Sequence, residues 1–301
     1  MQHKLTALGR SPLLRTWLGV VFISFSGVLV RQADVEVARS AFLRGAYALP
    51  FLWALAAWTR RGQGWPRLDG RALLAGALLG ADLVAWHGCI AIIGAGLATV
   101  LPNLQVVIVA AAGALLFGER PSRLFWIALP VVLGGVWLLA ATSQPITPGA
   151  SLPLGVGLGL LTALFYSAYL LLLRVARAKA PALSAVEIMS SATLGVTLLT
   201  GVVAAYEGVA GPAPTLEANA WLLALALGSQ VFGWLLLASS IHRLPAALTA
   251  VSLLLQPLLA VIWGVTLLGE PIGPVQLAGA ALLLGGVTLA HRAVSARSPR
   301  P

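Results

Sequence analysis

Two pairs of residues with equal spacing have the side chains that could bind a small polar solute. Asp82 is followed four residues later by Trp86, and Gln230 is followed four residues later by Trp234. Residues four apart lie on one face of a helix, so each pair would present a polar group beside an indole ring. A carboxylate or amide binds polar groups, and an indole offers stacking or cation–π contact. Alternatively, Asp82 is hydrogen-bonded to neighbouring helices or protonated in an apolar core.

Further polar residues lie within long apolar runs. Pro102 precedes Gln105 by three positions, and Pro257 directly follows Gln256. Because proline removes a helical hydrogen bond, it frees backbone carbonyls that a cavity can use. Each glutamine could instead hold two helices together by a hydrogen bond. The same two interpretations apply to His87 and Asn103, while Tyr166 and Tyr169 place polar handles on one helical face.

The composition indicates which elements position these residues. The chain has 301 residues, of which 59% are hydrophobic and only 9% are Asp, Glu, Lys or Arg. A soluble domain carries about 25% charged residues, and with far fewer it would expose large apolar patches to water. A disordered chain would be richer in charge and poorer in apolar residues. The composition therefore excludes a soluble enzyme and a disordered protein.

Apolar runs long enough to cross a membrane recur along the whole chain. A spanning helix needs about 20 mostly apolar residues. The strands of a transmembrane barrel would alternate at every second residue, which stretches such as LLAGALLG do not. The sequence therefore predicts an all-α polytopic membrane protein with ten transmembrane helices. We expect them near residues 16–31, 38–58, 72–93, 97–117, 122–141, 154–174, 184–206, 219–241, 246–268 and 272–291.

The Lys and Arg residues predict how these helices are oriented, because such residues are enriched in cytoplasmic loops. With ten helices threaded in order, most of the 19 Lys and Arg residues fall on one side, together with both termini. The uncharged segment around Thr147 falls on the opposite side. We therefore expect an inner (plasma) membrane protein with both termini in the cytoplasm, Gln63 on the cytoplasmic side and Thr147 on the periplasmic side.

The two halves of the chain resemble one another. Residues 97–139 align without gaps on residues 248–290, which pairs Gln105 with Gln256. Five helices in each half is an odd number, so the second half must enter the membrane from the opposite side. Inverted repeats around a central cavity are typical of alternating-access transporters, and a duplicated channel or membrane enzyme is the alternative. The predicted repeats are residues 1–147 and 148–301.

These repeated segments carry a family resemblance. ALLFGERPSRLFWIALPVVLGGVWLL and GVTLLGEPIGPVQLAGAALLLGGVTL each place Gly-Glu after one helix and a double glycine in the next. This pattern resembles the EamA-type branch of the drug/metabolite transporter superfamily, and the chain is also similar to its YddG-type amino acid exporters. The resemblance implies a cavity walled by the first, third, fourth, sixth, eighth and ninth helices. Glu119 and Glu270 are expected to cap the helices that follow them, where the helix dipole favours an anion.

Arg44, in SAFLRGAYA, matches an arginine that is common early in the second helix of that branch. Its long side chain could extend outward to the membrane surface. Its guanidinium could instead bind the carboxylate of a substrate. The sequence leaves both interpretations open.

The sequence thus predicts a secondary transporter of amino acids with aromatic or large apolar side chains. A zwitterion in a low-dielectric site needs partners of both signs, which Asp82 and Arg44, or the amides of the three glutamines, could supply. The outward direction follows from the family resemblance alone. The alternatives are a transporter of another small metabolite or drug, a membrane-embedded enzyme and a channel.

Several classes of partner and chemistry are not expected. No HExxH or GxSxG motif supports an enzyme, no repeated charged ring supports a channel, and no nucleotide-binding loop occurs. The single Cys89 excludes a thiolate metal cluster, so no cofactor or metal is predicted. We expect a small-molecule substrate and membrane lipid as partners, and no nucleic acid. The sequence leaves the oligomeric state open, and a monomer is compatible with it.

Overall fold

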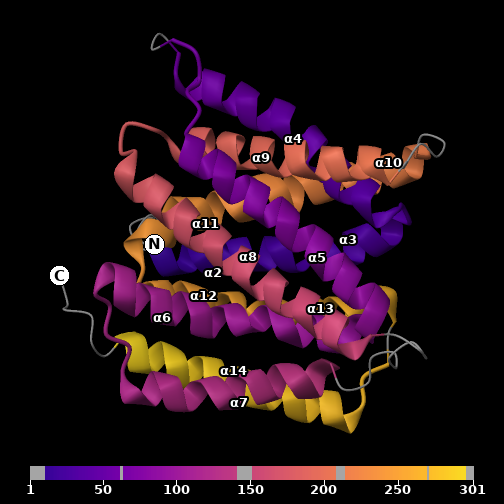
Figure 1. The fold of residues 1–301 in the computed structure, drawn as a ribbon, viewed down its shortest axis with the longest axis vertical. Helices are drawn as coiled ribbons and strands as arrows, with labels where there is room; N and C mark the ends of the chain where they lie inside the picture. Colours follow the sequence, from indigo (N-terminus) through magenta and orange to yellow (C-terminus); the bar gives the residue numbers. More distant parts are fainter. Residues whose placement is uncertain (1–10, 62–63, 141–150, 208–213, 270, 296–301) are drawn as a thin grey trace, which may run out of the picture. The chain divides into compact units, whose positions relative to one another are not determined.

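The computed structural model describes residues 11–61, 64–140, 151–207, 214–269 and 271–295, which form helices and contain no strand (Figure 1). The helices in the first half are α2 (Pro12–Ser24), α3 (Ser26–Ala33), α4 (Val37–Thr59), α5 (Gly70–Val100), η1 (Leu101–Leu104), α6 (Gln105–Phe117) and α7 (Arg123–Ala140). Those in the second half are α8 (Leu152–Lys179), α9 (Ala185–Tyr206), α10 (Leu216–Leu225), η2 (Ala226–Gly233), α11 (Trp234–Ser240), η3 (Ile241–Arg243), α12 (Ala246–Leu253), α13 (Leu255–Leu268) and α14 (Pro274–Ser295).

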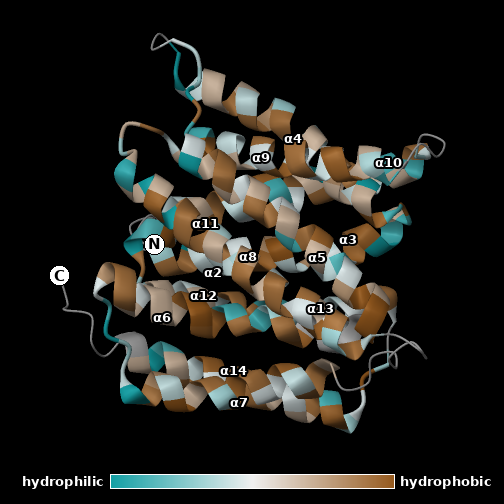
Figure 2. Cartoon of the chain, in the orientation of Figure 1, coloured by the Kyte–Doolittle hydropathy of each residue, from teal (hydrophilic) through white to brown (hydrophobic). Residues whose placement is uncertain are grey.

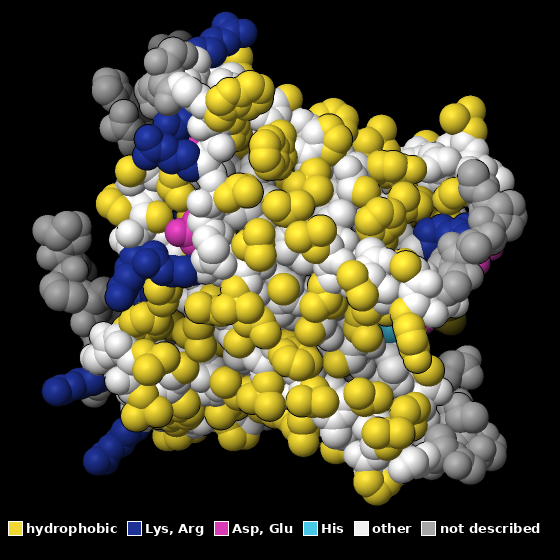
Figure 3. Space-filling view, turned by 45° about the horizontal axis from the view of Figure 1, so that its top comes forward, with side chains coloured by type: hydrophobic (Ala, Val, Ile, Leu, Met, Phe, Trp, Pro, Cys, Tyr) yellow, Lys and Arg dark blue, Asp and Glu magenta, His cyan; other side chains and the backbone are white. Residues whose placement is uncertain are grey.

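The helices have the length and hydropathy of membrane spans. Among the described residues, nine helical segments are long and apolar enough to cross a membrane, and Leu101–Phe117 is a shorter apolar helix. Figure 2 shows their predominantly hydrophobic residues in brown, and in Figure 3 hydrophobic side chains dominate the visible surface. Such a surface suits contact with lipid. The prediction of an all-α polytopic membrane protein with ten helices is confirmed.

The third and fourth predicted helices are connected by a reversal of the chain. Nε1 of Trp86 donates a hydrogen bond to the carbonyl oxygen of Ala98 at 2.8 Å. In a straight helix these residues would be about 18 Å apart along the axis, beyond the reach of an indole. The chain therefore turns back between them, although α5 is helical to Val100. The regular part of the fourth helix begins only at Gln105, after the 3₁₀ turn η1.

The described chain forms two compact units that do not coincide with the predicted repeats. Unit 1 consists of residues Met1–Val84 and Ala168–Arg243, and unit 2 of residues Ala85–Ser167 and Leu244–Pro301. Each unit thus combines helices from both halves of the chain. The division of the sequence into repeats at residue 147 stays a prediction.

In unit 1, small residues let helices approach backbone to backbone. A Cβ atom added to Gly76 of α5 would overlap the backbone of Ala192 in α9, and one added to Gly195 of α9 would overlap Leu73. On α2, a Cβ at Gly19 would lie 2.8 Å from the carbonyl oxygen of Gly233. Because lipid is as apolar as the helices, no hydrophobic effect drives the helices together in a membrane. Close van der Waals packing of this kind stabilises their association instead.

Unit 2 contains the paired helices α7 and α14, which lie side by side in Figure 1. A Cβ at Gly135 of α7 would lie 2.6 Å from the backbone nitrogen of Leu283, and one at Gly279 of α14 would lie 2.7 Å from that of Leu139. Gly135 belongs to the LGGV sequence that recurs in α14. In the first half of the chain, this repeated motif therefore serves helix packing.

Glu119 caps α12, a helix that the sequence prediction did not connect with it. Both of its carboxylate oxygens accept a hydrogen bond from the backbone N–H of Ala246, at 3.0 and 2.8 Å. Ala246 is the first residue of α12, so the carboxylate lies at the positive end of that helix rather than serving only α7, which follows Glu119 in sequence. Glu270 lies outside the described residues.

Candidate functional site

The predicted site residues are divided between the two compact units. Unit 1 contains Arg44, Asp82, Tyr169, Gln230 and Trp234. Unit 2 contains Trp86, His87, Asn103, Gln105, Tyr166 and Gln256. The unit boundary crosses α5 after Val84 and α8 after Ser167, so it separates Asp82 from Trp86 and Tyr166 from Tyr169, whereas Gln230 and Trp234 stay in one unit. Each unit is therefore described separately.

In unit 1 the guanidinium of Arg44 is held by two consecutive residues of η2. Its Nε donates to Oε1 of Gln230 at 3.0 Å, and its Nη2 donates to Oγ of Ser229 at 3.0 Å. Both partners are buried and lie midway along the span Leu216–Arg243. Arg44 thus hydrogen-bonds to groups at membrane depth, and these bonds hold its guanidinium in unit 1.

The two partners of Arg44 are themselves anchored on other helices. Nε2 of Gln230 donates to Oγ1 of Thr193 in α9 at 3.1 Å, and the hydroxyls of Ser26 in α3 and Ser229 are hydrogen-bonded to each other at 2.8 Å. Both ends of the Gln230 amide therefore have partners within unit 1. The result is a hydrogen-bonded network that connects α3, α4, α9 and η2 through polar side chains.

The backbone is irregular at this network. η2 is a π-helical segment within the eighth span, flanked by α10 and α11. Such segments are rare and frequently occur at functional sites. Consecutive side chains of an α-helix diverge by about 100° around its axis, whereas here Ser229 and Gln230 bind one guanidinium. The altered backbone therefore accompanies the convergence of two neighbouring side chains on Arg44.

The first span is also interrupted, where α2 ends at Ser24 and α3 begins at Ser26. The hydroxyls of these serines donate to the carbonyl oxygens of Val21 and Ile23, at 2.7 and 2.6 Å. Serine bonds to the preceding turn bend helices. α2 packs against η2, so two irregular helical segments meet in unit 1. Irregular backbone at membrane depth is tolerated where it is buried in protein or lines a cavity.

Asp82 is the acidic member of this part of unit 1. It lies on α5, is 8% exposed, and is within electrostatic range of Arg44. An ionisable residue within a span costs at least about 2.5–3.5 kcal/mol on insertion scales and usually faces a partner or a cavity. Unit 1 thus brings together the two residues of opposite charge that the sequence predicts for the site.

Two predicted aromatic residues form part of the core of unit 1. The rings of Tyr169 and Trp234 pack edge to face, with centroids 4.8 Å apart and planes at 79°. Their residues are 0% and 2% exposed. Neither ring therefore offers an open face to a solute in this structure.

In unit 2, Trp86 packs into the reversal that follows it. Its hydrogen bond to Ala98 closes the turn, and its ring packs against an apolar cluster that includes Cys89 and Ile93. The ring of His87 lies 5.1 Å from that of Trp86, centroid to centroid. Both residues are partly exposed, as are Asn103 in η1 and Tyr166 on α8.

The repeat-related glutamines of unit 2 each keep one unused amide atom. Gln105 is 1% exposed, and its Nε2 donates to the carbonyl oxygen of Ala250 at 3.3 Å. Among the described residues, Oε1 of Gln105 and Nε2 of Gln256 are buried and have no hydrogen-bond partner. A buried amide atom left unpaired costs about 1–3 kcal/mol. One glutamine thus offers an acceptor and the other a donor to a water molecule or a solute.

The sequence did not single out Ser26, Thr193 or Ser229. Serine and threonine are common in spanning helices, where they bond to their own backbone, so their identity alone gives little signal. A usable signal was the polar pair Ser229-Gln230 enclosed by Gly228 and Gly233 within an apolar run. Within the described ranges, no group of three or more His, Cys, Asp or Glu residues is placed to hold a metal ion.

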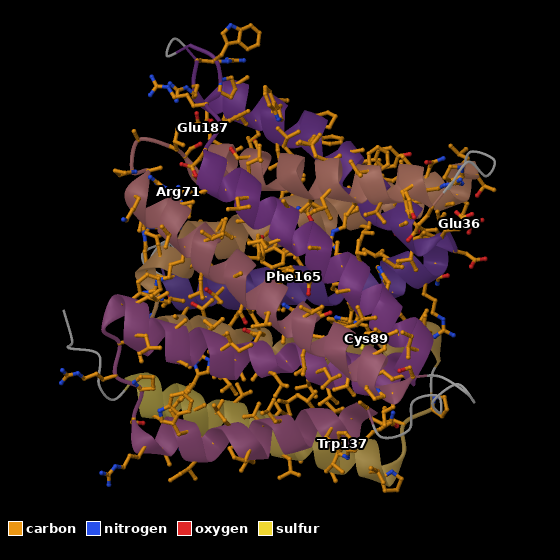
Figure 4. All side chains as sticks on the ribbon, in the orientation of Figure 1. Glu36, Arg71, Cys89, Trp137, Phe165 and Glu187 are labelled. Atoms are coloured by element: carbon orange, nitrogen blue, oxygen red, sulfur yellow. The ribbon has the colours of Figure 1, made fainter. Side chains whose placement is uncertain are left out.

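A second buried network lies at one end of unit 1, where Figure 4 shows Glu187 and Arg71, with Glu36 at the other end. One oxygen of Glu187 accepts from Nη1 of Arg60 at 2.9 Å and from the backbone of Arg67 at 3.0 Å. The other accepts from the backbone and hydroxyl of Ser184, at 2.9 and 3.1 Å. This carboxylate ties the connection between α4 and α5 to the first turn of α9.

Comparisons with known proteins agree with this architecture. Residues 10–141 and residues 153–292 each match the EamA-like transporter family. A solved crystal structure, described only as that of a protein, superposes with a TM-score of 0.77 at 16% sequence identity. The match covers 96% of this chain and 99% of the other, and at this identity it supports the fold alone. No curated protein matches the chain. Because the two family matches cover most of its length, the chain belongs to the EamA-like transporter family.

Proposed function

We propose that this transporter exports amino acids with aromatic or large apolar side chains by alternating access. Membership of the EamA-like family makes the chain a transporter of the drug/metabolite type. The observation that favours an amino acid is the placement of Arg44 and Asp82 within electrostatic range of each other in unit 1.

A zwitterion fits such a pair because its charges are complementary to both residues. The guanidinium of Arg44 can bind a carboxylate through two parallel hydrogen bonds, and the carboxylate of Asp82 can bind an ammonium group. A cationic drug would be attracted by Asp82 but repelled by Arg44. An anion would be attracted by Arg44 but repelled by Asp82. Since an uncompensated charge is costly in a low-dielectric site, the pair favours a ligand that carries both charges.

The preference for aromatic side chains rests on Trp86 and Tyr166. These are the two of the four candidate aromatic residues that remain partly exposed, because Tyr169 and Trp234 are buried. The outward direction rests on the resemblance to amino acid exporters. The distribution of Lys and Arg supports an inner-membrane location with both termini in the cytoplasm.

Counterflow in proteoliposomes tests this assignment. Vesicles that contain the purified protein and unlabelled phenylalanine should accumulate labelled phenylalanine, which a channel would not do. Phenethylamine lacks the carboxylate and 3-phenylpropionate lacks the ammonium group, so each should compete more weakly than phenylalanine. If no amino acid accumulates, or if both analogues compete as well as phenylalanine, the zwitterion assignment is wrong.

A further inference from the structure

The contacts of Arg44 resemble a carboxylate complex made from neutral groups. In a bidentate pair, two parallel N–H groups of a guanidinium bind the two oxygens of one carboxylate. Here Nε and Nη2, which form one edge of the Arg44 guanidinium, bind two oxygens at 3.0 Å each. One oxygen is the amide Oε1 of Gln230 and the other is the hydroxyl of Ser229.

We infer that Ser229 and Gln230 act as an internal substitute for the substrate's carboxylate, which must displace them to bind Arg44. This inference rests on the proposed function, since it requires a substrate that carries a carboxylate. It reassigns Gln230 from a direct ligand of the substrate to a competitor of the substrate. It also adds Ser229, Ser26 and Thr193 to the residues that determine specificity.

The arrangement meets a requirement of a carrier that must also change conformation while empty. A buried guanidinium without partners is strongly destabilising, because its desolvation is not compensated. The oxygens of Ser229 and Gln230 contribute to that compensation together with the nearby Asp82, and Ser229 and Gln230 are almost fully buried, at 0% and 1% exposure. The empty transporter can therefore keep Arg44 at membrane depth without a bound anion.

The same arrangement selects for charge. The guanidinium is charged in both states, but a carboxylate adds the attraction of a full negative charge and a planar bidentate geometry, which two neutral oxygens lack. A carboxylate therefore gains free energy when it replaces the two neutral oxygens. A carboxamide or an ester replaces neutral acceptors with neutral acceptors and gains little. The pair thus acts as a filter against uncharged relatives of the substrate.

Ser229 and Gln230 are anchored by hydrogen bonds but lie on an irregular helical backbone. Thr193 anchors the amide of Gln230, and Ser26 anchors the hydroxyl of Ser229. Both residues belong to the π-helical η2, whose hydrogen bonds span five residues rather than four. A return of η2 to α-helical bonding would shift its hydrogen-bond register by one residue and turn Ser229 and Gln230 away from their present directions. This change offers a route for their displacement.

Binding of 3-phenylpropionate and phenylalanine to the purified protein tests the inference. Gln230→Ala and Ser229→Ala each remove a competing acceptor, so the dissociation constant of both ligands should fall by about fivefold. Gln230→Glu places a permanent carboxylate beside Arg44 and should raise the dissociation constant of both ligands at least about tenfold. Thr193→Val removes the hydrogen-bond acceptor that anchors Gln230 but leaves both partners of Arg44 unsubstituted. It should also lower the dissociation constant, and it serves as the test if Gln230→Ala does not fold.

Matched controls make the same chemical changes elsewhere. Gln276→Glu repeats the glutamine substitution in the first turn of α14, and Ser239→Ala removes a hydroxyl that bonds within its own helix. Neither should alter the dissociation constant. If Gln230→Ala, Ser229→Ala and Thr193→Val weaken binding, these residues only position Arg44 and the inference is wrong. It is also wrong if Gln230→Glu binds as the wild type does.

The outcome separates this inference from the proposed function. If the wild type transports phenylalanine but Gln230→Ala, Ser229→Ala and Thr193→Val bind it more weakly, the inference is overturned and the proposed function stands. If the wild type moves no amino acid but the substitutions change the affinity for 3-phenylpropionate in the expected directions, the inference stands and the proposed function is overturned. Failure of the wild type to bind either carboxylate overturns both.

Discussion

The guanidinium of Arg60 and the carboxylate of Glu187 form a buried ion pair, with Nη1 2.9 Å from Oε1 and side chains 9% and 2% exposed. The same carboxylate receives the backbone N–H groups of Arg67 and Ser184. A single acidic side chain therefore organises one end of unit 1.

Removal of that carboxylate should destabilise the protein strongly. Glu187→Ala leaves Arg60 buried without its counter-ion and should lower the free energy of unfolding by about 3–5 kcal/mol. The measurement is thermal or denaturant unfolding in detergent. Glu36→Ala is the matched control, because its pair with Arg39 spans 3.5 Å and its side chain is 59% exposed. That control should change the free energy of unfolding by less than about 1 kcal/mol. Equal losses in both variants would contradict the conclusion that the buried pair contributes more to stability than the exposed one.

The orientation of the helices can be tested with single cysteines after replacement of Cys89. Trp65 and Tyr206 are 87% and 91% exposed, and the Lys and Arg distribution predicts that they lie on the cytoplasmic and periplasmic sides, respectively. In whole cells, a cysteine at residue 206 should react with an impermeant thiol reagent and one at residue 65 should not. Gln63 and Thr147, for which the sequence predicts the same two sides, lie outside the described residues and can be labelled in the same way. Reaction at 65 but not at 206 would invert the topology.

Asp82→Asn should impair transport without preventing folding. Asparagine keeps the size of the side chain but removes the charge that the substrate's ammonium group would meet. We expect transport to fall by about tenfold, the effect of one lost charged hydrogen bond, or its pH dependence to change. The measurement is counterflow at several pH values, and Asp34→Asn on the exposed surface is the control. Wild-type transport at every pH would remove Asp82 from the site.

Export of aromatic amino acids predicts a growth phenotype. Cells that overproduce the protein should tolerate toxic phenylalanine or tryptophan analogues better than control cells. Trp86→Ala and Tyr166→Ala should abolish that tolerance, because each removes a partly exposed ring. Trp86→Phe separates ring contact from the hydrogen bond to Ala98, and Trp137→Ala changes an exposed tryptophan on α7 as a control. Equal tolerance in all of these variants would exclude the two rings from recognition.

The helices were predictable because hydropathy and length are local properties of the chain. The sequence placed the spans within a few residues, and its repeat marked the closely packed Gly135 of α7. The partners of Arg44 were not predictable, because they lie 185 and 186 residues away along the chain. The π-helical form of η2 was also missed, since nothing in an apolar run separates bonding over five residues from bonding over four.

The predicted ligands show the same division between local and distant information. The depth of Asp82 and Arg44 in their spans could be read from the sequence, but their proximity could not. The equal spacing of Gln230 and Trp234 suggested one shared face, yet Gln230 bonds to Arg44 and Thr193 while Trp234 packs on Tyr169. Spacing along a helix gives a direction in space, whereas the neighbour in that direction depends on tertiary packing.

The long sequence separation between Arg44 and its partners constrains how the protein is made. A ribosome that adds about 5–20 residues per second completes Ser229 and Gln230 roughly 10–40 s after Arg44. Throughout that interval the second span carries a cation whose η2 acceptors have not been synthesised, and an arginine within a spanning helix opposes insertion, by about 2.5–3.5 kcal/mol when it lies at the helix centre. Asp82, in the next span, is the earlier countercharge. Stable insertion of the second span thus depends on helices that are synthesised later. In nascent chains truncated before η2, the second span should therefore be retained poorly in the membrane.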